Sequence, residues 1–174
     1  MHIARLLASD AQSYRALMLH AYSAAADAFT STAEERAQEP ESWWMSRIAD
    51  PKGLSQSFGA FHQDELIGTV TVEFSAKPKT RHKAHVIGMF VRENARGLGA
   101  RAQLLREALD AVRARPEIRV ITLTVTEGNT PAIRLYEAQG FKAFGTEPMA
   151  IATPQGFKGK VHMWLQLSQA HTEA

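Results

Sequence analysis

The stretch Val91-Arg-Glu-Asn-Ala-Arg-Gly-Leu-Gly-Ala-Arg101 decides the fold, because it joins an apolar run to the most strongly patterned helix of the chain. Gly97 and Gly99 let the main chain approach a ligand without a Cβ in the way. The helix that follows directs unpaired N–H groups and the positive end of its dipole at the same place, and Arg96 adds a full charge. We interpret the stretch as a backbone site for phosphate. For a bare Gly-x-Gly the alternative is an ordinary turn before a helix.

The residues on both sides of this stretch predict a parallel crossover unit. His85 to Val91 is a short apolar strand, residues 102–112 carry one apolar helical face, and Val120 to Val125 is another strand. A strand, helix and strand connected in this way form a right-handed parallel unit. Beyond it, Thr130 as a cap and Pro131 at the first helical position predict a second, short helix.

The flanking segments predict further strands and helices around this unit. They are a strand at Ile3 to Leu7, a helix capped by Ser9 or Asp10, a helix from Pro40 through Ile48, strands at Ser57 to Phe61 and Leu66 to Phe74, and a final hairpin of Glu147 to Ala152 with Lys160 to Leu167. Trp43 and Trp44 are adjacent and cannot share one helix face, so one is expected in the core and the other at a groove or partly exposed. We expect residues 1–174 to form a single α/β domain, a mixed sheet flanked by helices.

Composition excludes several classes of protein. The formal net charge is +2 with acidic residues interspersed throughout, so no nucleic-acid partner is indicated. The chain has no cysteine, and its seven histidines lack zinc-site spacing, so we expect no metal. No apolar run reaches membrane-spanning length and no export signal is recognisable, which predicts a cytoplasmic protein that does not bind membranes.

A dinucleotide-binding loop is the first alternative for the glycines. Gly97-x-Gly99-x-x-Ala102 formally satisfies that fingerprint, but a charged segment separates the strand from the first glycine. This fingerprint also requires an acidic residue about 20 positions later. The candidate is Glu127, which comes too late in the sequence. No Gly-Lys-Ser/Thr follows either, so the sequence disfavours both nucleotide folds.

Two separated blocks resemble the Gcn5-related N-acetyltransferase (GNAT) family. The acetyl-CoA signature Val-x-x-x-x-Arg-Gly-x-Gly-x-Gly/Ala is matched at Val91, Arg96, Gly97 and Gly99. The later block of the family is matched by Asn129, Ala132, Leu135-Tyr136-Glu137 and Gly140-Phe141. Arg101 departs from the pattern, which usually has Gly or Ala there. Either its side chain swings toward water and adds a donor for phosphate, which we favour, or it crowds the site.

The resemblance implies acetyl-CoA as cosubstrate. The N–H groups of Leu98, Gly99, Ala100 and Arg101, with the charge of Arg96, would hold the pyrophosphate. The pantetheine arm would pair with the strand at Met89, Phe90 and Val91, and would contact Asn129 and Ala132. An asparagine in a turn also serves local backbone bonding.

The resemblance further implies that an amine attacks the acetyl carbonyl directly and that Tyr136 protonates the departing thiolate. Glu73 or His85, on strands leading toward the site, could remove the proton of the amine directly or through water. The expected partner is an amine-bearing small molecule, amino acid or peptide, and a homodimer is compatible with the sequence. The alternative from another class is a non-catalytic acyl-CoA-binding regulatory module, which would need neither Tyr136 nor a base.

Overall fold

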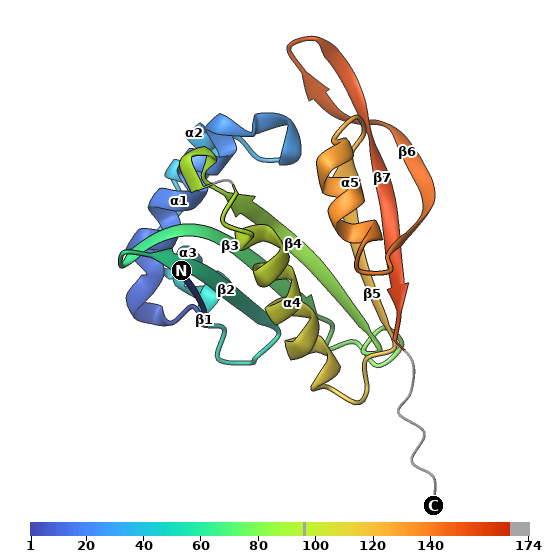
Figure 1. Ribbon diagram of the computed structural model, residues 1–174, viewed down its shortest axis with the longest axis horizontal. Helices are drawn as coiled ribbons and strands as arrows, with labels where there is room; N and C mark the ends of the chain where they lie inside the picture. Colours follow the sequence, from blue (N-terminus) through green and yellow to red (C-terminus); the bar gives the residue numbers. More distant parts are fainter. Residues whose placement is uncertain (96, 168–174) are drawn as a thin grey trace, which may run out of the picture.

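The computed structural model describes residues 1–95 and 97–167, and its described strands form one twisted sheet (Figure 1). The strands are β1 (His2–Arg5), β2 (Ser55–His62), β3 (Glu65–Phe74), β4 (Lys83–Val91), β5 (Val120–Thr126), β6 (Lys142–Thr153) and β7 (Gly156–Gln166). Their spatial order is β1-β2-β3-β4-β5-β7-β6, in which β4 and β5 are parallel and the other neighbours antiparallel. The prediction of a mixed sheet with a parallel pair is confirmed.

Helices cover both faces of this sheet. They are α1 (Ala11–Ala24), α2 (Ala33–Ala37), α3 (Glu41–Ile48), α4 (Ala100–Arg113) and α5 (Thr130–Glu137), with short 3₁₀ turns η1 (Ala8–Asp10), η2 (Ala26–Ala28) and η3 (Glu93–Ala95). The apolar face of α4 and part of α5 belong to one buried core, whereas α1 and α3 form a second core. The crossover unit is therefore covered by α4 and α5 on one side and faces α1 and α3 on the other.

Strand alternation explains this division. Along β3, Val70 and Val72 are completely buried in the core under α4. Thr71 lies between them and points to the opposite face, where its hydroxyl lies 2.6 Å from that of Ser57. Because successive side chains of a strand point to opposite faces, β3 supplies an apolar surface to α4 and a polar one to the side of α1 and α3.

The final hairpin is confirmed, and several strands are longer than expected, whereas β1 ends at Arg5 and not at Leu7. Gln63 and Asp64 have positive φ, as a two-residue hairpin between β2 and β3 requires. Thr153 pairs with Gly156 at the end of the last hairpin. Trp44 is fully buried and Trp43 is partly buried, so the two neighbouring tryptophans take the two different roles expected.

Two expected helix starts are displaced, and the third, at Asp10, lacks a side-chain cap. Asp10 stands at the N-cap of α1, yet its carboxylate accepts a hydrogen bond from the N–H of Leu7 at 2.7 Å and makes none to α1. Asn129, and not Thr130, caps α5, because its side chain accepts a hydrogen bond from the N–H of Ala132. Pro40 occupies the N-cap of α3 and not its first turn. The helices themselves begin within two residues of the predicted places.

Candidate active site

The two parallel strands are paired at one end and separate toward the other. Lys83–His85 of β4 pairs with Val120–Thr122 of β5, and beyond this point Figure 1 shows the strands diverging. Between Ile87 and Phe90, β4 also carries an extra residue relative to β3, with Gly88 at a φ of +63°. Such a bulge bends the strand and interrupts its pairing with the neighbouring strand. The outcome is an opening between β4 and β5.

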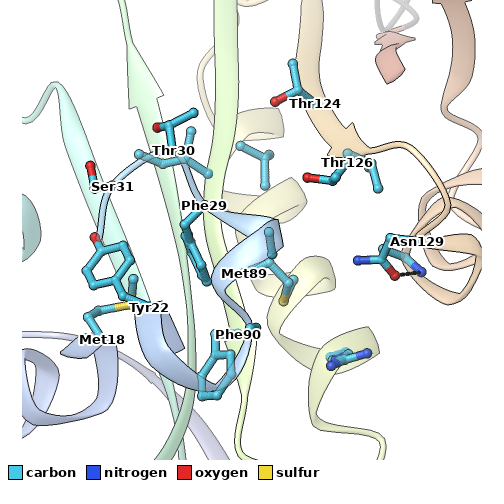
Figure 2. A pocket seen from close by; sticks show the side chains of 18 of the residues that line it. Met18, Tyr22, Phe29, Thr30, Ser31, Met89, Phe90, Thr124, Thr126 and Asn129 are labelled. Atoms are coloured by element: carbon cyan, nitrogen blue, oxygen red, sulfur yellow. Dashed lines mark hydrogen bonds between the residues drawn. The ribbon is translucent and has the colours of Figure 1, made fainter. Parts of the chain in front are cut away.

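A cleft of about 690 Å³ occupies this opening (Figure 2). One wall comes from α1, α3 and the segment of residues 25–36, the middle from residues 86–90 of β4, and the other wall from β5, α5 and Arg101. The close-up shows Tyr22 and Phe29 on the first wall, across the cleft from Thr124 and Thr126. Met89 and Phe90, both predicted to contact the cofactor, line the cleft, while Val91 is buried in the core under α4.

The glycine loop, which we define as residues 97–99, requires glycine for its backbone. Gly97 has a φ of +84° and Gly99 a φ of +72°, in the left-handed region that other residues rarely adopt. A Cβ built at Gly97 would meet no atom within 4 Å, so the space beside it is open. Arg96, predicted to add charge here, lies outside the described residues.

The start of α4 offers donors beside this open space. Gly99 is the N-cap and makes no side-chain cap, and the first turn contains no acidic residue. The N–H groups of Ala100 and Arg101 belong to the first turn, whose donors have no partner within a helix. Leu98 is exposed and Ala100 is buried against the core. The loop thus has the open backbone and unneutralised dipole that suit a pyrophosphate.

Arg101 lines the cleft, and its role as a donor for phosphate stays a prediction. Its side chain is half-buried and lines the cleft near Tyr136. Burial raises the pKa of Tyr136 to about 12, and the charge of Arg101 acts in the opposite direction. At the start of α4, a side chain tilts back toward the N-terminus of its helix, and here the glycine loop leaves that direction open.

Tyr136 is held by the short helix α5. Its side chain is 6% exposed, packs edge-on against Phe141 at a centroid distance of 5.8 Å, and still lines the cleft. A phenol with a pKa near 12 is protonated at neutral pH and can donate its proton. Ala132, one turn earlier, lines the cleft too.

Asn129 combines the two roles that the sequence left open. Its Oδ1 accepts the N–H of Ala132 at 3.3 Å and so caps α5. The residue also lines the cleft, as Figure 2 shows. The cap uses only Oδ1, so the amide N–H₂ of Asn129 can serve a ligand in the cleft.

Glu73 and His85 are brought together but not into the cleft. They face one another across the β3–β4 ladder and line a smaller neighbouring pocket that also includes Thr122. His85 Nδ1 lies 2.9 Å from the hydroxyl of Thr122, and burial lowers the pKa of His85, against a smaller raising effect of Glu73. Arg47 connects the two sites, because it lines the cleft and pairs with Glu73 at 3.6 Å.

The wall formed by α1 to α3 contains residues that the sequence interpretation missed. Arg36 and Arg47 line the cleft, as do Tyr14 and Tyr22. One local signal was available, because Trp43 and Arg47 are four residues apart, a spacing at which side chains meet on a helix. Nothing in the sequence places Arg36 beside them, since the chain leaves α2 before α3 begins.

The described part of the chain lacks two features. None of its helices is long and apolar enough to cross a membrane. Across residues 1–95 and 97–167, no three His, Cys, Asp or Glu side chains gather closely enough to hold a metal ion.

The fold resembles solved acetyltransferase structures over almost its whole length. An acetyltransferase of the GNAT family from Streptococcus pneumoniae has a TM-score of 0.79 at 21% identity, covering 95% of this chain and 99% of that one. The yncA protein of Salmonella typhimurium, solved with its cofactor acetyl-CoA, has a TM-score of 0.80 at 18% identity, covering 100% of this chain and 98% of that one. At these identities the likeness concerns the fold.

Sequence comparison adds the family. An L-amino acid N-acetyltransferase, AaaT of Escherichia coli (strain K12), is 30% identical over 103 residues, which are 59% of this chain and 62% of that protein. The match thus spans less than two thirds of that relative. The profile of the acetyltransferase (GNAT) family matches residues 18–141, which include the glycine loop, the separated strands and α5. The chain belongs to the GNAT family of acetyltransferases, whose members use acetyl-CoA.

Proposed function

We propose that this protein transfers the acetyl group of acetyl-CoA to the primary amine of a small molecule, amino acid or peptide by direct attack. One observation carries the proposal: a buried, protonated tyrosine, Tyr136, lines the cleft that opens where β4 and β5 separate. The relation to an L-amino acid N-acetyltransferase supports an amine as the acceptor.

The residues of the cleft fit this cosubstrate. The N–H groups at the start of α4 and the open space beside Gly97 suit a pyrophosphate, and Arg101 adds a cation at the same end. The bulged segment at Gly88 and Met89 leaves β4 free to hydrogen-bond an extended chain lying along the cleft. Acetyl-CoA supplies the reactive thioester. Tyr136 then delivers its proton to the sulfur that departs when the amine attacks.

The base is proposed among the residues of the smaller pocket. A lowered pKa keeps His85 in its neutral, proton-accepting form at neutral pH. His85 stands two positions before Ile87, which lines the cleft. Because His85 itself lines the neighbouring pocket, the proton of the amine would reach it through water. Separate His85→Asn and Glu73→Gln variants distinguish the two candidates. The base variant should lose about 10²–10⁴-fold in turnover, and a variant with parental turnover is not the base.

The test of the reaction is thiol release from acetyl-CoA with a panel of amines, amino acids and short peptides. We expect release that depends on both acetyl-CoA and an acceptor, with the acetylated amine identified by mass spectrometry. The non-catalytic alternative predicts tight acetyl-CoA binding with no acceptor-dependent release from any member of the panel. That result would overturn the proposal.

A further inference from the structure

Two arginines surround one tryptophan on the wall of the cleft opposite Tyr136. The guanidinium carbon of Arg36, on α2, lies 4.6 Å from the ring centroid of Trp43, and that of Arg47, on α3, lies 5.1 Å from it. Both arginines line the cleft. Each guanidinium therefore lies against the Trp43 ring, and both belong to the wall formed by α2 and α3.

Neither guanidinium is fully used by the protein. Arg36 pairs with Glu39 and Arg47 with Glu73, in each case through Nη1, at 3.2 and 3.6 Å. The Nε atoms of both arginines are buried and make no hydrogen bond. A buried N–H without a partner is costly, and each guanidinium has five N–H donors, of which the two ion pairs engage those on Nη1.

Tyrosine hydroxyls extend this polar surface. Burial raises the pKa of Tyr14, and Arg47 lowers it in part. Burial likewise raises the pKa of Tyr22, and Arg36 is among the groups that lower it. Both tyrosines line the cleft and stay protonated at neutral pH, so each presents a hydroxyl beside an arginine.

The charge of the cleft is one-sided. Its lining includes Arg36, Arg47, Arg101 and Lys160, and no Asp or Glu of the described chain. Arg101 stands beside Tyr136 and the glycine loop, where the cosubstrate is expected. Arg36 and Arg47 come from α2 and α3 on the other wall, so their charge is available to the second substrate. A cleft lined by one sign of charge attracts a ligand of the opposite sign.

We propose that Arg36 and Arg47 form a carboxylate subsite, and that the acceptor is therefore an amine that carries a carboxylate, such as a free α-amino acid. The planar fork of a guanidinium matches the two oxygens of a carboxylate. The subsite rests on the proposed acetyl transfer and deepens it, because a peptide N-terminus or a simple amine lacks the carboxylate that it recognises.

The test compares acceptors that differ only in this group. Three sets, built on L-leucine, L-phenylalanine and L-lysine, each contain the amino acid, its primary amide and its decarboxylated amine. With saturating acetyl-CoA, kcat/KM of the parent should favour the acid within each set. In Arg36→Gln the KM for the acid should rise about 10- to 100-fold, as expected for a lost charged hydrogen bond, while the amide changes little. The ratio of kcat/KM for the acid to kcat/KM for the amide should therefore decrease strongly.

Controls separate this effect from loss of folding. Arg113→Gln removes an arginine that pairs with Asp110 on the exposed side of α4, so the ratio should remain parental. Arg36→Lys keeps the charge without the planar fork of the guanidinium. Its ratio of kcat/KM for the acid to kcat/KM for the amide should lie between the ratios of the parent and of Arg36→Gln. Circular dichroism and acetyl-CoA titration should be unchanged in all three variants. A loss of acetyl-CoA affinity in Arg36→Gln would assign the arginine to the cosubstrate and overturn the subsite.

A binding measurement tests the subsite without turnover. In the presence of coenzyme A, N-acetyl-L-leucine should raise the melting temperature of the parent more than N-acetyl-L-leucinamide, and Arg36→Gln should abolish the difference. Equal shifts for acid and amide in the parent would reject the subsite, even if acetyl transfer is observed. Absence of thiol release with every amine, together with a preserved preference for the acid in binding, would reject the reaction and not the subsite.

Discussion

The wall of the cleft that includes the glycine loop and α5 is built differently from the wall that includes α1 to α3. The first uses backbone N–H groups, two glycines of positive φ and one phenol, all within residues 97–136. The second uses side chains of Tyr14, Tyr22, Arg36 and Arg47, drawn from three helices. Changes on the first wall should therefore alter the cosubstrate and the chemical step, and changes on the second the choice of acceptor.

Removing the hydroxyl of Tyr136 should have the largest effect. Tyr136→Phe keeps the packing against Phe141 but deletes the proton donor, so turnover should fall about 10²–10⁴-fold. Affinity for acetyl-CoA should change little, because the ring still fills its place. The measurement is steady-state thiol release at saturating acetyl-CoA, with a cofactor titration on the same preparation.

A different result would remove Tyr136 from the mechanism. Near-parental turnover, with or without a change in melting temperature, would mean that the tyrosine is only part of the core and that water protonates the thiolate. The matched comparison is Tyr14→Phe on the opposite wall, which should change the KM for the acceptor but leave kcat at saturating acceptor near the parental value.

A side chain at Gly99 tests the backbone character of the first wall. Asparagine tolerates a φ of +72° better than other residues, so Gly99→Asn adds bulk with little strain. At a hundredfold excess over the dissociation constant, acetyl-CoA should stabilise the parent by about 2.7 kcal/mol. The variant should lose most of this stabilisation, measured by thermal or chemical unfolding with and without acetyl-CoA. A parental shift in the variant would place the phosphates elsewhere.

Arg101 tests whether a side chain supplements that backbone. It is half-buried, so we expect Arg101→Ala to weaken coenzyme A binding by about 1.5 kcal/mol, the lower end for a charged hydrogen bond. The salt dependence of binding should decrease as well. Titrations at low and high ionic strength measure both. Tighter binding in the alanine variant would show that the arginine crowds the cleft.

The difference between the walls also explains how much could be read from the sequence. Glycines of positive φ, a helix start and a capped short helix are local features, so the sequence predicted the glycine loop, the parallel pair and the position of Tyr136 in α5. It could not predict the direction of the Arg101 side chain, since that depends on the space left by other elements. It also assigned the N-cap of α5 to Thr130, whereas the side-chain oxygen of the neighbouring Asn129 accepts the capping hydrogen bond.

Most of the second wall could not be predicted from the sequence, and the reason is physical. Arg36 and Arg47 meet over Trp43 only because α2 and α3 fold back beside α1, and no repeat or spacing records that arrangement. Strand alternation likewise placed Glu73 and His85 on neighbouring strands, but it did not show that they open into the smaller pocket beside the cleft.

The smallest expected effect concerns the junction between the walls, where His85 contributes a pH dependence of stability. Burial lowers its pKa below the ordinary 6.5, so the unfolded chain binds this proton more tightly than the folded protein. The corresponding stability is fully present above pH 6.5 and is lost as the pH falls through the folded pKa. His85→Asn, which keeps a donor near the hydroxyl of Thr122, should therefore flatten the fall in unfolding free energy between pH 7.5 and about 5.

The difference should be small, because the ring is only partly buried and solvent screens it. Urea unfolding at half-unit steps of pH measures it. The matched control is His82→Asn, which replaces an exposed histidine just before β4 and leaves the pocket around His85 intact. A His85→Asn profile as steep as that of the parent would mean that the acid sensitivity arises elsewhere. It would also weaken the case for a neutral His85 as the base, since the proposed role requires the same lowered pKa.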